Sequence, residues 1–163
     1  GYNVVTVAKE QRNPYLNKFI NESRKNDLNL TVFPKSKSTS KELIKRLNNK
    51  EIFALFSDHR DKGALVNFFG MEAKAPTGAI SLALKFDIPL IWGYNYFNSD
   101  NSCTSVVEKF EMVKTGNFKE DVLNNTQRLI KNMEEVIRKH PEQWMWFHDR
   151  WSLYSKLYKG KRK

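Results

Sequence analysis

The order of hydrophobic and polar residues predicts strands and helices that alternate along the chain. Segments rich in Val, Thr, Ile and Phe predict strands and lie at residues 3–8, 28–33, 51–57, 88–97 and 104–113. Segments with apolar residues at helical spacing lie at residues 14–27, 39–48, 77–86 and 119–140. The runs 51–57 and 88–97 are almost continuously apolar, which is typical of strands buried on both faces, whereas 104–113 alternates like a strand with one face in solvent.

The ends of the predicted helices carry recognisable signals. Pro14 suits the first position of a helix, where its missing N–H would have no partner anyway. Thr39 and Glu42 form a capping box, in which each side chain accepts a free backbone N–H. The longest predicted helix ends before Pro141. Its apolar face recurs at spacings of 4, 3, 4 and 3 residues, at Val122, Thr126, Leu129, Met133 and Val136.

The alternation of strands and helices predicts an α/β fold with a mixed, largely parallel sheet flanked by helices. Residues 58–78 are expected to form a polar loop that becomes apolar at Phe68-Phe69-Gly70. No repeat, low-complexity segment or linker is evident, so we expect a single domain over residues 1–163. A strand pattern begins almost at once and the first residue is Gly1, not Met. We therefore expect that an N-terminal part of the domain is missing from this sequence.

The net charge of +10 is unevenly distributed. Residues 1–50 carry +7, residues 51–100 carry −2 and residues 101–163 carry +5. Such ends attract anionic partners, including nucleic acid, lipid headgroups and acidic proteins, although a solvated lysine-rich surface would look the same. Cys103 is the only cysteine, so no intrachain disulfide can form, which fits a reducing compartment. No apolar run approaches the roughly 18 residues of a membrane-spanning helix.

Two groups of polar residues are candidates for chemistry. Asp58 and His59 follow a predicted buried strand, where α/β folds place ligands. They suit an acid–base pair or a weak metal site, but also an Asp that caps loop N–H groups beside an exposed His. Lys9, Arg12 and Arg24 lie after the first strand and on the helix that returns from it. They suit a phosphate or carboxylate site, or else are scattered surface cations.

Other sites are not supported by the sequence. No phosphate-binding glycine motif is present, and one Cys with three His cannot supply a four-ligand zinc site at any usual spacing. We therefore expect neither a nucleotide nor a metal cofactor. The C-terminal stretch from Arg150 onward carries six Lys and Arg with Trp, Leu and Tyr between them. This composition suits a basic amphipathic helix at a membrane surface, a nucleic-acid contact or a frayed terminus.

The stretch HPEQWMWFHDRW resembles the C-terminal signature of the bacterial lipid A biosynthesis acyltransferases. The family pattern reads roughly Pro-Glu-Gln-aromatic-x-Trp-x-His-x-Arg-aromatic. The matching residues are Pro141, Glu142, Gln143, Trp144, Trp146, His148, Arg150 and Trp151. Asp149 departs from the family, which usually has Arg there.

Two further blocks resemble the same family in the same order. In residues 1–24 the matching residues are Asn13, Pro14 and Arg24, while Lys9 stands where the family usually has Arg. In residues 54–85 the matching residues are Asp58, His59, Gly63, Phe68, Phe69, Gly70 and Gly78. The likeness thus runs the full length of the chain.

The resemblance implies a glycerolipid-acyltransferase-like α/β domain, preceded in the family by a membrane helix. It implies transfer of a fatty acyl chain from acyl carrier protein to a hydroxyl of a Kdo-bearing lipid A precursor, without metal or nucleotide. The implied location is the cytoplasmic face of the bacterial inner membrane. Acyl carrier protein, the precursor and the membrane surface are the implied partners, and nucleic acid is not.

The family's catalytic motif is His-x-x-x-x-Asp/Glu, whose His is the general base on the acceptor hydroxyl. None of His59, His140 and His148 is followed by an acid at the fifth position. We therefore expect a truncated or split enzyme, with the base on an upstream fragment, or else a non-catalytic remnant that binds membrane or acyl carrier protein.

The resemblance also suggests roles for the residues that are present. Lys9, Arg12 and Arg24 are expected to contact the phosphorylated acceptor or the carrier protein. Asp58 and His59 are expected to shape the site. The tryptophans Trp144, Trp146 and Trp151 are expected where the chain meets the apolar core, the membrane or acyl chains.

Overall fold

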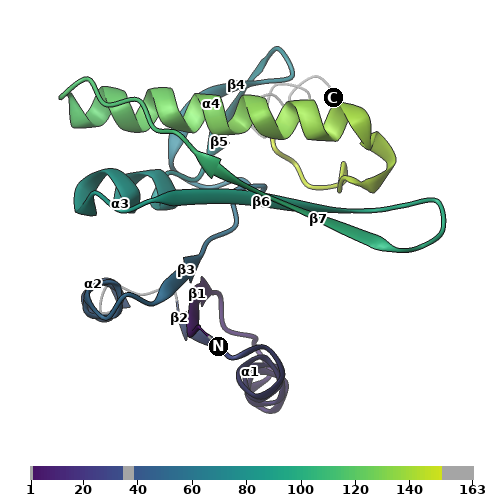
Figure 1. Ribbon diagram of the computed structural model, residues 1–163. Coiled ribbons are helices and arrows are strands. Elements are labelled where there is room, and N and C mark those ends of the chain that lie inside the picture. Colours follow the sequence, from purple (N-terminus) through teal and green to yellow (C-terminus); the bar gives the residue numbers. More distant parts are fainter. Residues whose placement is uncertain (1, 35–38, 152–163) are drawn as a thin grey trace, which may run out of the picture. The chain divides into compact units, whose positions relative to one another are not determined.

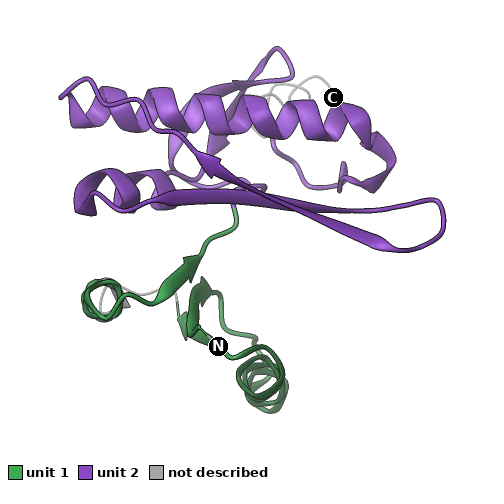
Figure 2. Cartoon of the chain, viewed as in Figure 1, with its two compact units in different colours: residues 1–56 green, residues 57–163 purple. Residues whose placement is uncertain are grey.

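The computed structural model describes residues 2–34 and 39–151, except for the side chains of residues 39 and 40. The chain divides into two compact units, Gly1–Phe56 and Ser57–Lys163, coloured separately in Figure 2. The capping-box side chain of Thr39 and the basic C-terminal stretch after Trp151 lie outside the described residues.

The first unit is built on a parallel sheet of three strands, in the order β2-β1-β3 (Figure 1). The strands are β1 (Val4–Ala8), β2 (Leu30–Pro34) and β3 (Ile52–Ala54), joined by the helices α1 (Pro14–Leu28) and α2 (Thr39–Asn48). Val5 in the central strand is fully buried. The hydroxyl of its neighbour Thr6 donates to the Ala54 carbonyl at 2.7 Å, which ties β1 to β3. The predicted α/β alternation and parallel pairing are confirmed in this unit.

The bounds of α1 follow from its capping residues. Asn13 precedes the helix in an extended conformation, and its side-chain oxygen accepts the N–H groups of Tyr15 and Leu16 at 3.0 and 3.3 Å. Pro14 occupies the first turn, as predicted. The helix ends where Asn29 adopts a left-handed backbone with φ 49°, a conformation that Asn tolerates.

The second unit contains two antiparallel hairpins and two helices. Its elements are β4 (Ala64–Phe68), β5 (Met71–Ala75), α3 (Gly78–Phe86), β6 (Leu90–Phe97), β7 (Cys103–Phe110), α4 (Phe118–Lys139) and the short 3-10 helix η1 (Pro141–Gln143). One core cluster joins β4 and β5 to α4 through Val66, Phe68, Ala73, Ala75, Ile130 and Ile137. A second joins α3 and β7 to α4 through Ile80, Phe110 and Leu129.

Three sequence expectations are wrong. Residues 64–75 are a hairpin, not a loop, and its two-residue turn at Phe69-Gly70 has φ values of 52° and 80°. Such a turn is usually signalled by Asn-Gly or Asp-Gly, so Phe-Gly concealed it. The predicted largely parallel sheet does not extend into this unit, because short turns join consecutive strands in antiparallel pairs.

The two strands expected to be buried on both faces are not. In β3, Ile52 is 46% exposed. In β6 the side chains alternate between half-buried and exposed, as in a strand with one covered face. The Tyr94 and Tyr96 rings continue the half-buried face, 6.3 Å apart.

Candidate functional site

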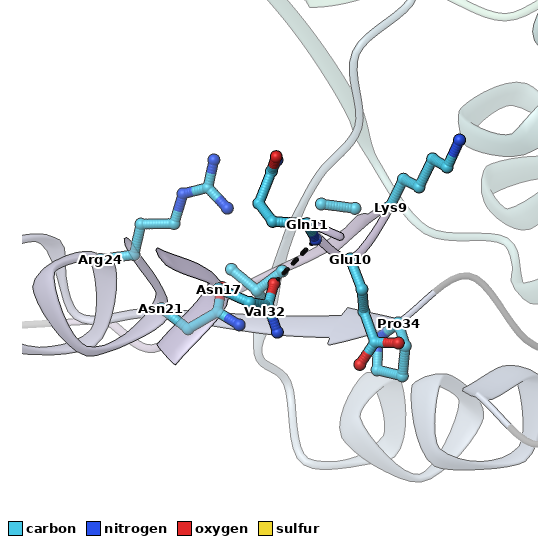
Figure 3. A pocket seen from close by; sticks show the side chains of 9 residues that line it. Lys9, Glu10, Gln11, Asn17, Asn21, Arg24, Val32 and Pro34 are labelled. Atoms are coloured by element: carbon cyan, nitrogen blue, oxygen red, sulfur yellow. Dashed lines mark hydrogen bonds between the residues drawn. The ribbon is translucent and has the colours of Figure 1, made fainter. Parts of the chain in front are cut away.

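A polar pocket lies at the carboxyl end of β1, within the first unit (Figure 3). Its space for water-sized molecules is about 80 Å³, which suits a small anionic group better than an acyl chain. The lining residues come from β1 and the loop after it, from α1 and from β2. They are Ala8, Lys9, Glu10, Gln11, Asn17, Asn21, Arg24, Val32 and Pro34.

Helix α1 supplies three hydrogen-bonding side chains to the pocket. Asn17, Asn21 and Arg24 are spaced by four and three residues and therefore share one face of the helix. The side chain of Asn17 accepts the backbone N–H of Gln11 at 3.1 Å, which holds the loop after β1 against the helix. Amide and guanidinium N–H groups together can bind phosphate or carboxylate oxygens.

The predicted basic group is only partly brought together. Figure 3 shows Arg24 reaching from α1, while the Lys9 ammonium extends away from it on the other side of the pocket. Arg12 is exposed and is not among the described residues that line the pocket. Sequence reasoning missed Gln11, Asn17 and Asn21, although the helical spacing of the two asparagines with Arg24 was a usable signal.

Asp58 and His59 lie in the second unit, in the segment before β4. Asp58 is exposed, and the Nε2 atom of His59 is 4.0 Å from the Asp61 carboxylate. The backbone N–H of Arg60 donates to the Nε2 atom of His148 at 3.2 Å. This bond joins the predicted polar segment to the C-terminal signature, 88 residues away in sequence.

The tryptophans of the signature pack against the β4–β5 hairpin. The Trp151 ring stacks on Phe68 with centroids 5.3 Å apart, and Trp144 meets Phe68 edge-on at 5.6 Å. Trp146 meets Phe69 at 5.8 Å but is 47% exposed. The structure therefore places Trp144 and Trp151 against the apolar core and leaves Trp146 partly in solvent.

Other residues of the signature fix the chain around it. The Gln143 side chain accepts the Phe97 N–H at 2.7 Å and donates to the Phe97 carbonyl at 2.9 Å. It thereby bonds to the backbone as a neighbouring strand would, and it holds η1 to the end of β6. The indole N–H of Trp146 donates to the Pro141 carbonyl at 2.6 Å.

Arg150 is the least expected side chain of the signature. It is 1% exposed, and its guanidinium lies 5.1 Å from the centroid of the Phe68 ring. Burial lowers the pKa of the Arg150 guanidinium, and the negative charge of Asp58 opposes this shift. Sequence reasoning matched Arg150 to a motif but missed its burial, because arginine is normally exposed.

The described residues offer neither a metal cluster nor a membrane span. They contain no group of three or more His, Cys, Asp or Glu side chains placed to hold a metal ion. No helix in the described part of the chain is both long and apolar enough to cross a membrane.

The fold and the pocket define a mixed α/β protein with a small cationic site. The sequence profile described as bacterial lipid A biosynthesis acyltransferase matches residues 1–152. The chain therefore belongs to the family of bacterial lipid A biosynthesis acyltransferases. No curated protein matches the sequence.

Proposed function

We propose that the chain contributes to the transfer of a fatty acyl group from acyl carrier protein to a hydroxyl of a Kdo-bearing lipid A precursor. The observation that carries the proposal is the family match over residues 1–152. The acyl donor and the acceptor follow from what the family does. The excess of basic residues supports both partners, because acyl carrier proteins are acidic and the precursor carries phosphates and carboxylates.

The pocket of the first unit is our candidate for one anionic group of the acceptor. Arg24 supplies planar N–H donors that match two phosphate oxygens. Lys9 keeps the positive charge of the family's usual Arg but has no such planar fork. Glu10 lines the same pocket and offsets part of the charge, so we expect modest affinity for a lone phosphate.

The catalytic base is not assigned to this chain. None of its three histidines is followed by an acid at the fifth position. We propose that a fragment outside these 163 residues supplies the His-x-x-x-x-Asp/Glu motif, and that Asp58 and His59 shape the site instead of acting as nucleophile or base.

We further propose peripheral contact with the cytoplasmic face of the inner membrane through residues 145–147. Phe147 is 100% exposed, Met145 70% and Trp146 47%. Aromatic side chains beside cations favour the interface between lipid headgroups and acyl chains. The other two tryptophans of the signature pack on Phe68 and are less suited to such contact.

A transfer assay tests the proposed reaction. The purified chain is mixed with acyl carrier protein loaded with laurate or myristate and with a Kdo-bearing lipid A precursor, with and without a fragment that carries the His motif. We expect transfer only when the fragment is present. Transfer by the chain alone would mean that another residue, such as His59, acts as the base.

The second candidate function is binding without catalysis, and the missing His motif favours it. A folded mixture that transfers no acyl group but still binds acyl carrier protein or anionic vesicles would support it. Binding to DNA that exceeds binding to anionic vesicles and falls steeply with salt would contradict both candidates.

A further inference from the structure

Arg150 carries a buried charge that lacks a hydrogen-bond partner among the described residues. Its Nε, Nη1 and Nη2 atoms are all buried, and none of them donates a hydrogen bond to a described acceptor. The side chain is 1% exposed, so solvent does not replace the missing partners. The Phe68 ring, at 5.1 Å, offers a cation–π contact. Such a contact satisfies none of the guanidinium N–H groups, and an unpaired buried charge costs several kcal/mol.

Asp58 is the natural counter-ion. It is the one acid whose charge acts on Arg150 in the described chain, and its own carboxylate takes part in no described hydrogen bond. The segments that carry the two residues are already joined, because the Arg60 N–H donates to the Nε2 atom of His148 at 3.2 Å. Two opposite charges without hydrogen bonds thus lie on segments that are tethered to each other.

We propose that Arg150 is a positioning residue, which binds the Asp58 carboxylate and thereby fixes the segment that carries Asp58 and His59. The pair forms when this exposed segment settles onto the guanidinium, and it turns an unpaired buried charge into a charge-assisted hydrogen bond. The inference rests on the proposed function only in assigning Asp58 and His59 to the acceptor site.

Two competing causes for the burial of the guanidinium predict different results. If the contact with Phe68 alone holds the guanidinium, replacing Asp58 should change nothing. If general electrostatics hold it, Asp149, which is exposed and adjacent in sequence, should matter as much as Asp58. Asp61 is already near His59, at 4.0 Å, and is a poorer candidate for the counter-ion.

A double-mutant cycle on the full chain tests the pair. The variants are D58N, R150M and D58N/R150M, with D149N as the matched control. Urea unfolding, followed by circular dichroism, gives the folding equilibrium constant of each variant. We expect D58N to lower this constant about a hundredfold, because it leaves the buried charge unpaired, and D149N to change it less than about threefold. In the R150M background, D58N should have almost no effect, because the methionine side chain leaves no charge to neutralise.

An additive result would overturn the proposal, because D58N would then lower the folding constant equally in the wild-type chain and in the R150M background. If D58N does not fold, the conservative variant D58E replaces it, and the Nε–H resonance of Arg150 is followed by NMR. We expect D58E, and not D149E, to shift that resonance, and an unchanged resonance would also overturn the proposal. Neither experiment uses an acyl donor or acceptor, so a failure of the proposed reaction is distinguishable from a failure of this pair.

Discussion

The indole N–H of Trp151 donates to the backbone carbonyl of Phe68 at 3.0 Å, while the two rings stack 5.3 Å apart. One side chain thus satisfies a strand carbonyl and covers the largest hydrophobic residue that is fully buried. This contact, between positions 83 residues apart, attaches the C-terminal signature to the β4–β5 hairpin.

The two parts of the Trp151 contact can be separated by mutation. W151F keeps an aromatic ring on Phe68 but loses the hydrogen bond, so the free energy of unfolding should fall by about 1 kcal/mol. W151A also loses the stacking and should cost about 3 kcal/mol. Urea unfolding followed by circular dichroism measures both. F147A is the control, because its ring is fully exposed, and it should cost less than about 0.5 kcal/mol. Equal costs for W151A and F147A would contradict the structural role.

A buried asparagine links α4 to the chain that follows β7. The side chain of Asn125 is fully buried, accepts the Val113 N–H at 2.9 Å and donates to the Val113 carbonyl at 2.7 Å. N125A would leave both backbone groups without their partner, and we expect it to lower the free energy of unfolding by about 3 kcal/mol. N124A changes an exposed neighbour and should cost less than about 0.5 kcal/mol. A loss below about 1 kcal/mol for N125A would show that water replaces these bonds.

Asp121 should make stability depend on pH in the acid range. Its carboxylate accepts the hydroxyl of Thr115 at 2.7 Å and the N–H of Thr115 at 2.8 Å, and these bonds hold the pKa of Asp121 below its ordinary value of 3.8. A lowered pKa in the folded state gives stability that is present above the ordinary pKa and is lost as pH falls through the folded-state pKa.

The comparison of D121N with the wild-type chain measures this contribution. The wild-type chain should unfold at a higher urea concentration than D121N at about pH 6, and the difference should shrink as the pH falls below about 4. E120Q, which changes the exposed carboxylate next to Asp121, is the control. A difference that stays constant between about pH 6 and about pH 3 would mean that ionisation of Asp121 does not contribute.

The sequence predicted those parts of the fold that depend on local signals. The helix that starts at Pro14 and the long helix that ends before Pro141 have strong caps and clear periodicity, and both are confirmed. The hairpin at residues 64–75 was missed, because Phe69 adopts a positive φ that its side chain does not signal. The burial of each strand also escaped prediction, since it depends on which other segments cover it.

The same distinction applies to the candidate site. Arg24 and Lys9 could be associated with one pocket, because Lys9 follows a strand and Arg24 lies on the helix that returns from it. The exclusion of Arg12 depends on the path of the loop between them and could not be predicted. The burial of Arg150 depends on packing against Phe68, which is 82 residues away in sequence, so local patterns gave no indication of it.

The exposed apolar residues at 145–147 should contribute to binding of anionic vesicles. Phe147 is completely exposed, so F147S removes apolar surface available to lipid without disturbing the core. We expect F147S to reduce binding to vesicles that contain phosphatidylglycerol by about tenfold, as judged by co-sedimentation. V107S is the control, because Val107 is 69% exposed but lies on β7. Equal losses for the two variants would mean that residues 145–147 have no special role.

The polar pocket should bind phosphate through Arg24 more than through Lys9. R24A removes a planar donor group on the face of α1 that carries Asn17 and Asn21, and we expect the Kd for inorganic phosphate to rise about tenfold. K9A should weaken binding less, because the Lys9 ammonium extends away from Arg24. The N–H signal of Gln11, whose backbone is tied to Asn17, reports the titration by NMR.

Lys25 offers a matched control for this titration, because it is the exposed neighbour of Arg24 and does not line the pocket. K25A removes the same charge from the chain, so it corrects for the general loss of positive potential. A Kd that rises equally in R24A and K25A would show that phosphate responds to net charge and not to the pocket. If R24A alone weakens phosphate, the same variants should also weaken binding of the Kdo-bearing precursor, and an unchanged precursor affinity in K9A would remove Lys9 from the acceptor site.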